Sequence, residues 1–111
     1  MDTQRHFMPG VDRYAFDFRS CHYKRGWAQC DTSQDASYFG IWTNPFSLKI
    51  VTYAEGDVTI QTAATEAEYR DAVRKMADWY RDNDQWRGID GMCHAQIITR
   101  MHALNLGELL H

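Results

Sequence analysis

Two cysteine–histidine pairs are the residues of this chain whose types could do chemistry. Cys21-His22 lies near the start and Cys93-His94 near the end, and Cys30 is a third thiol. Zinc binds thiolate and imidazole ligands, so a fold that brought the two pairs together could hold a structural zinc ion. The spacing matches no CxxC knuckle, however, and neighbouring side chains on a strand point to opposite faces. We therefore predict that the cysteines are small core residues, with no metal and no cofactor.

Cys93 is also a candidate nucleophile. It follows Gly91 at a predicted helix N-terminus, where the helix dipole favours the thiolate. His94 is adjacent in sequence, which is a poor geometry for a Cys–His dyad, so His22 or His102 would have to serve as the base. The local signatures of cysteine enzymes are absent. The sequence favours a protein without catalytic residues, and a small enzyme or ligand-binding domain that uses Cys93, His94 and His22 is the alternative.

Acidic pairs are the other candidates for metal or acid–base chemistry. They are Asp31 with Asp35 and Asp82 with Asp84. An acid in a loop is usually a turn former or a helix cap, which is our interpretation of Asp35 and Asp82. The segment Gly88-Ile89-Asp90-Gly91 is too short and too isolated to be a phosphate loop, and we predict a turn there.

Aromatic residues are in surplus, at 14% of the chain. A single sheet buries one full face, so some of these side chains must lie on the other face or at the edges. Exposed tryptophan is typical of protein interfaces, although aromatic residues also wrap the edges of a small core. Our candidates for anchors in an interface are Trp42, Trp79 and Trp86.

The charge balance is mildly acidic. Fifteen acidic and twelve basic residues give a net charge of −3, which disfavours direct binding of nucleic acid. Much of the excess falls in the first predicted helix, where an exposed face would be solvated by charges in any case. The acids that we single out as candidates for binding a partner are Glu66, Asp71, Asp78 and Asp82.

A β-hairpin followed by a helix is the clearest structural pattern. Residues 46–53 form an apolar run, residues 58–62 alternate apolar with polar, and Glu55-Gly56-Asp57 is a turn between them. Shorter runs of the same kind predict further strands at residues 13–23, 27–31 and 37–43. Short turns between strands favour an antiparallel meander of four or five strands.

At Thr65 the apolar period changes from 2 to 3.6. Thr65 and Glu68 form a capping box, and Tyr69, Val73 and Tyr80 lie on one apolar stripe that also holds Met76 and Ala77. This pattern predicts a helix over Glu66–Asp82. A second, shorter helix is predicted over residues 93–104. The fold class is therefore α+β, with both C-terminal helices packed on one face of the sheet.

Length and composition predict one domain. The chain has 111 residues, of which 24% are charged, and it is large enough for a single packed core. We expect residues 1–12 to be a flexible arm and residues 13–111 to be the domain. No apolar run is long enough to span a membrane and no signal peptide is evident, so we expect a cytoplasmic protein. A homo-oligomer is left open.

Three segments carry a resemblance to a known group of proteins. They are Phe18–Gln29, Asp35–Pro45 and Gly88–Cys93. Together they resemble a group of small uncharacterised proteins of proteobacterial plasmids and phages, and the likeness covers about residues 13–111. No activity is established for that group, so the resemblance implies no site residue. It implies a setting in which small proteins often bind a host protein, and inhibitors of CRISPR or restriction systems are a prominent class.

These observations lead to one functional expectation. We expect a non-enzymatic inhibitor or adaptor that binds a host protein, with a nucleic-acid defence complex as the expected partner and anti-CRISPR or other anti-defence activity as the result. Such a protein needs an exposed aromatic or acidic patch. The alternative enzyme or ligand-binding domain needs a concave site with convergent polar groups.

Overall fold

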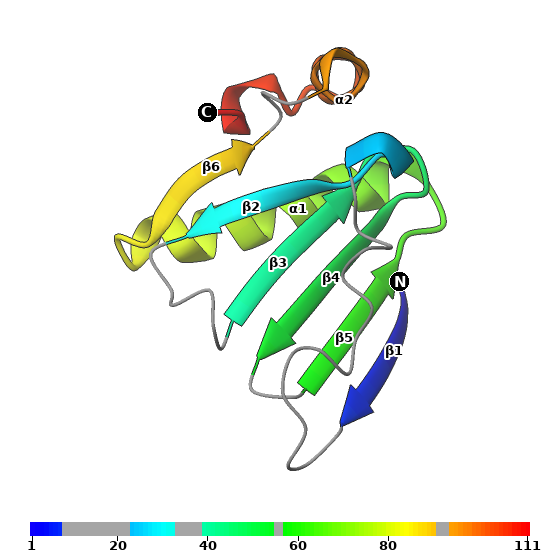
Figure 1. Cartoon of the computed structure of the whole chain (residues 1–111), viewed down its shortest axis with the longest axis vertical. Coiled ribbons are helices and arrows are strands. Elements are labelled where there is room, and N and C mark those ends of the chain that lie inside the picture. Colours follow the sequence, from blue (N-terminus) through cyan, green and yellow to red (C-terminus); the bar gives the residue numbers. More distant parts are fainter. Residues whose placement is uncertain (8–22, 33–38, 55–56, 91–93) are drawn as a thin grey trace.

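The predicted hairpin and the helix after it form the centre of an α+β fold (Figure 1). The computed structural model describes residues 1–7, 23–32, 39–54, 57–90 and 94–111. The strands are β1 (Asp2–Phe7), β2 (Ala28–Thr32), β3 (Phe39–Asn44), β4 (Lys49–Ala54), β5 (Asp57–Thr62) and β6 (Trp86–Asp90). The α-helices are α1 (Glu66–Asp82) and α2 (Ala95–Ala103), and two short 3₁₀ helices are η3 (Tyr23–Arg25) and η4 (Gly107–Leu109).

The six strands within these described residues form one antiparallel sheet in the order β1-β5-β4-β3-β2-β6. The prediction of four or five strands is therefore one or two short. The central strands β2, β3, β4 and β5 agree with the predicted ones to within a few residues. The predicted strand at residues 13–23 lies outside the described residues, except for Tyr23, which begins η3.

The two edge strands are the elements that the sequence analysis missed. Residues 1–12 were expected to form a flexible arm, but residues 2–7 form β1 and pair with β5 along its whole length; residues 8–12 lie outside the described residues. Gly88-Ile89-Asp90 was expected to be part of a turn, but these residues belong to β6, which pairs with β2. Both edge strands form through backbone hydrogen bonds to a neighbouring strand. The spacing of apolar residues in the sequence does not predict such pairing.

Helix α1 begins where the capping box predicted. The Thr65 hydroxyl accepts a hydrogen bond from the Glu68 backbone N–H at 3.1 Å, and the helix ends where Asn83 donates to carbonyls of the last turn. Tyr69, Val73 and Ala77 are fully buried and share one core with the sheet residues Ala28, Cys30, Ile41 and Ile50, with Met76 and Tyr80 packed against it. The predicted apolar stripe is confirmed.

Helix α2 packs against the same core as α1, near the turn between β3 and β4. Its buried residues Ile97 and Met101 join the same core, but Arg100 contacts the turn between β3 and β4 through the Pro45 carbonyl. Figure 1 shows α1 crossing behind the sheet and α2 lying beyond its end. The expectation that both helices lie on one face of the sheet is therefore not confirmed for α2. No helix in the described part of the chain has the length and apolar character needed to cross a membrane.

The other face of the sheet carries a smaller apolar cluster. Because side chains alternate along a strand, Ile50 faces α1 and Val51 faces away. Val51, Tyr53 and Val58 form the buried part of this cluster. The half-buried side chains packed against it are Trp27, Trp42 and Ile60.

Candidate functional site

The solvent side of α1 carries the largest exposed side chain of this helix together with three aspartates. We call Asp71, Asp78, Trp79 and Asp82 the α1 outer face; all four are exposed, and Trp79 is 58% exposed. With 3.6 residues per turn, the three aspartates fall within about 40° of one another around the helix axis and opposite the buried Val73. Trp79 is three residues before Asp82, so the two side chains are neighbours on the helix surface.

The charge on this face is only partly neutralised within the chain. Asp78 forms an ion pair with Arg81, one turn later, at 3.3 Å. Asp71 and Asp82 make no ion pair with any residue that the structure describes. Exposed ion pairs on a helix contribute little stability, so the aspartates are not needed to hold α1 together. Their chemistry suits a basic surface.

The Trp79 indole rests on its neighbour in the sequence. Its ring lies edge-on to the Tyr80 ring with the centroids 4.8 Å apart, and the Tyr80 ring in turn lies 5.9 Å from that of Phe39. Burial raises the pKa of the Tyr80 phenol, so it stays neutral at physiological pH. A ring supported in this way loses less conformational freedom on binding than a free side chain does.

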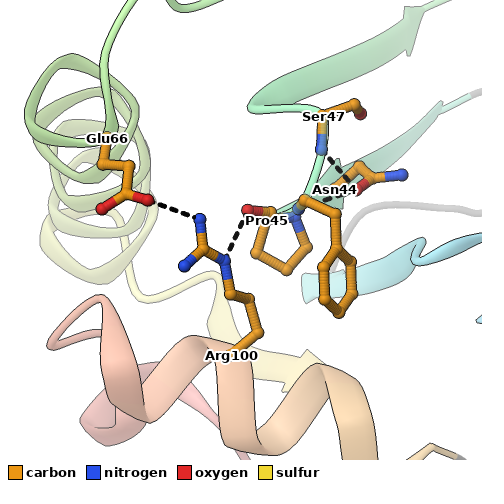
Figure 2. A network of polar contacts seen from close by, with 6 residues as sticks. Asn44, Pro45, Ser47, Glu66 and Arg100 are labelled. Carbon is orange, nitrogen blue, oxygen red and sulfur yellow. Dashed lines mark hydrogen bonds and ion pairs between the residues drawn. The ribbon is translucent and has the colours of Figure 1, made fainter.

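Glu66 lies at the start of α1 and already has a partner within the chain. Its carboxylate accepts a hydrogen bond at 2.8 Å from Arg100 of α2, and the Arg100 Nε donates to the Pro45 carbonyl at 3.1 Å (Figure 2). This interaction ties α1, α2 and the β3–β4 turn together. Glu66 is therefore a structural residue first, and the α1 outer face does not include it.

The three candidate tryptophans lie in three different environments. Trp42 is half-buried in the cluster on the sheet face away from α1, and its six-membered ring lies over Gly40. Trp86 is half-buried against the main core from β6. Of the three, only Trp79 is exposed beside the candidate acids. It lies on α1 outside the buried stripe, next to the exposed Asp78.

The candidate zinc and thiol chemistry falls mostly on residues that are not described. Cys21, His22 and Cys93 lie outside the described residues. Cys30 is buried in the main core, and burial raises the pKa of its thiol to about 12, so it stays a neutral thiol at physiological pH. His94 caps α2, since its Nδ1 accepts a hydrogen bond from the Gln96 N–H at 3.2 Å.

The candidate acidic pairs do not form a site in the part of the chain that is described. Asp31 in β2 is paired with the His111 Nε2 at 3.1 Å, and Asp35 lies outside the described residues. Asp82 is the last residue of α1 and Asp84 follows the helix; the C-terminal cap is Asn83, so the interpretation of Asp82 as a cap is wrong. No three His, Cys, Asp or Glu side chains among the described residues are grouped so that they could hold a metal ion.

A second candidate region is a hollow at the N-terminus of α2. It measures about 250 Å³, and it is lined by Tyr23, Lys24, Arg25, Gly26, Phe46, His94, Gln96 and Ile97. Lys24, Arg25 and Phe46 were not among the candidate site residues that the sequence predicted. The Asn-Pro pair at residues 44–45 marks the turn that carries Phe46, but nothing in the sequence places that turn beside α2.

No protein-family model matches the chain, and no curated protein or solved structure matches it at a significant level.

Proposed function

We propose that this protein is a non-enzymatic inhibitor or adaptor that binds a host protein through the α1 outer face. The observation that carries the proposal is the exposure of Trp79 beside three exposed aspartates on the helix face opposite the core. A large aromatic side chain ringed by charges is the usual composition of an interface anchor and its rim. The proposed surface does not include Trp42 or Trp86, because both side chains are packed against the protein's own apolar clusters.

The chemistry of the face also restricts the partner. Asp71 and Asp82, which make no ion pair within the described part of the chain, attract a basic surface. A basic surface that normally holds nucleic acid is one that an acidic helix can occupy. We therefore propose a nucleic-acid defence complex, such as a CRISPR effector or a restriction enzyme, as the partner class. The resemblance to proteins of plasmids and phages supports the same setting.

The first test is binding to purified CRISPR effector and restriction complexes, with a phage-plating assay in the host. Truncation of a central aromatic anchor typically costs about 2 kcal/mol or more of binding free energy, so Trp79→Ala should weaken binding by roughly 30-fold. Phe46→Ala is the matched control, because Phe46 is similarly exposed, at 49%, but lies outside the α1 outer face. Equal binding by wild type and Trp79→Ala would show that this face is not the interface.

The second test is the dependence of binding on salt. Neutralisation of Asp71 and Asp82 by asparagine should lower the association rate and flatten its decrease with ionic strength. Asp2→Asn, which removes a single negative charge on β1 away from this face, should leave both unchanged. If no defence complex binds and phage plating is unaffected, the proposed partner class is wrong.

The alternative function is a small enzyme or ligand-binding domain that uses Cys93 and His94 with His22. The observation in its favour is that His94 lines the hollow described above. A Cys93→Ala variant separates the two functions. It should leave binding of the host protein intact under the proposal, and its loss of some other measurable phenotype would favour the enzyme.

A further inference from the structure

We propose that the hollow between η3, the β3–β4 turn and α2 binds a small anion that carries a flat apolar ring. This site is separate from the α1 outer face and independent of the function proposed for that face. The hollow has a volume of about 250 Å³. That is slightly below the range of about 300–1,000 Å³ for sites of drug-sized ligands, which limits the occupant to a small molecule.

The walls of the hollow are held in place by one buried side chain. Asn44 is only 4% exposed. Its Nδ2 donates to the Arg25 carbonyl at 3.0 Å, and its Oδ1 accepts from the Phe46 and Ser47 N–H groups at 2.9 and 3.0 Å. Figure 2 shows the contact between Asn44 and Ser47. One amide group therefore positions the residue that supplies a cation and the residue that supplies an aromatic ring.

Two further features fix the positions of the walls of the hollow. Arg100 ties α2 to the turn through the Pro45 carbonyl. Gly26 has φ +91°, and a Cβ there would lie 2.7 Å from the Phe46 ring and 3.1 Å from the Asn44 Oδ1. Only glycine allows this close approach without displacing the ring. The three walls form a preorganised site in which little ordering is needed when a ligand enters.

The lining has the opposite charge to the chain as a whole. Lys24 and Arg25 are cationic, and no lining residue that the structure describes is acidic, whereas the net charge of the chain is −3. The first turn of α2 also carries no acidic side chain, in contrast with the first turn of α1. Cationic side chains near a helix N-terminus attract an anionic group, and phosphate and carboxylate are the groups that arginine binds best.

The remaining lining residues favour a ring on the same ligand. Phe46 is 49% exposed and Tyr23 is 37% exposed, so both rings offer apolar surface to an occupant. The Tyr23 ring lies 5.8 Å from the His94 ring. Because the His94 Nδ1 accepts the Gln96 N–H, the neutral imidazole carries its proton on Nε2 and can donate from there. Nucleoside monophosphates and aromatic carboxylates share the required chemistry.

The test is a titration of the ¹⁵N-labelled protein followed by ¹H–¹⁵N spectra. The probes are adenosine monophosphate, benzoate, inorganic phosphate and adenosine. We expect adenosine monophosphate or benzoate to shift the amide signals of Arg25, Phe46 and Gln96, with weaker binding of inorganic phosphate. The ring-bearing anion that binds more tightly identifies the source as phosphate or carboxylate. The absence of localised shifts with both at concentrations up to about 10 mM would overturn the proposal.

Matched variants test the two halves of the site. Arg25→Gln should weaken binding of the ring-bearing anion roughly three- to tenfold, while Arg87→Gln, an equal charge change at an exposed position on β6, should not. Phe46→Ala should reduce the affinity to that for inorganic phosphate. Equal affinity for adenosine and adenosine monophosphate, or unchanged affinity in Arg25→Gln, would overturn the proposal. Trp79→Ala should bind the anion normally, so a failure here is distinguishable from a failure of the proposed function.

Discussion

At the scale of single residues, the core between α1 and the sheet contains polar groups that are satisfied internally. The Tyr69 hydroxyl is hydrogen-bonded to the Thr43 hydroxyl, which also donates to the Lys49 carbonyl. Burial raises the pKa of Tyr69, which keeps it neutral. Cys30 lies in the same core without a charged form at physiological pH. These groups link the stability of the protein to alkaline pH.

We predict that the free energy of unfolding falls as the pH rises from about 9 towards 12. Below pH 9 the Cys30 thiol is protonated in both states. Above it, the unfolded chain loses the proton while the folded protein, with a pKa of about 12, retains it, so the unfolded state is favoured. The slope for this one group reaches about 1.4 kcal/mol per pH unit.

Chemical denaturation at several pH values measures this effect. Cys30→Ala, compared with the parent protein in a Cys21→Ser/Cys93→Ser background, should show a shallower decrease. Parallel curves for the two proteins would mean that Cys30 is not shielded from water.

At the scale of elements, those with a local signal were predictable and those held by distant contacts were not. Helix α1 agrees with the approximate bounds that the sequence predicted, because Thr65 caps it and its apolar stripe has the period of a helix. Gly88 and Asp90 are typical turn residues, so the sequence predicts a turn where the structure has part of β6. They lie in a strand because β2 pairs with both of them, and Leu110 forms a bridge to Ile89 between them.

The candidate site followed the same division. Trp79 lies outside the apolar stripe of α1, so its exposure could be predicted once the helix was predicted. The pairing of Glu66 with Arg100 joins residues 34 positions apart, and the contact of Arg100 with Pro45 joins residues 55 positions apart. Neither contact leaves a mark in the local sequence.

Val73→Asp should unfold the domain. Val73 is fully buried at the centre of the α1 stripe, and an unpaired buried carboxylate costs several kcal/mol, which is a large part of the stability of a small domain. Ala67→Asp, at an exposed position on the same helix, should melt close to wild type. Circular dichroism melts of the two variants measure the difference, and a Val73→Asp protein that melts like wild type would place the stripe elsewhere.

Arg100→Met should destabilise the protein by about 1–2 kcal/mol, because it leaves the Pro45 carbonyl and the Glu66 carboxylate without their donor. Glu66→Gln should cost less than about 1 kcal/mol, since this half of the contact is exposed. Urea denaturation gives both values. Equal losses in the two variants would mean that the ion pair, and not the carbonyl contact, holds α2.

At the scale of the whole molecule, the sheet joins distant parts of the chain. Strand β1 closes one edge by pairing with β5, and β6 closes the other by pairing with β2. The end of the chain then covers β6, where the His111 N–H donates to the Ile89 carbonyl and the His111 ring contacts Asp31. Folding must therefore close long loops before either edge forms, which slows it relative to a protein with local contacts.

Gly88→Ala should loosen this second edge. Gly88 has φ +120°, and an added Cβ would lie 2.5 Å from the Cβ of His111. We expect a loss of more than about 1 kcal/mol and faster hydrogen exchange at the His111 amide, while amides of β4 keep their protection. Arg87→Ala, one residue earlier with an exposed side chain, is the control. Unchanged exchange at His111 in the Gly88 variant would show that the tail does not press on β6.

The order of the strands also determines how the molecule would respond to a mechanical load. Handles at Asp2 and Leu110 would pull on β1 and on the tail against β6, which lie at opposite edges of the sheet (Figure 1). The pull would run across the strands, so the hydrogen bonds of each edge would open one after another, as in a zipper. A sheet pulled along its strands shares the load among many bonds at once. This protein should therefore yield at low force from its edges inwards, with β3 and β4 the last to separate.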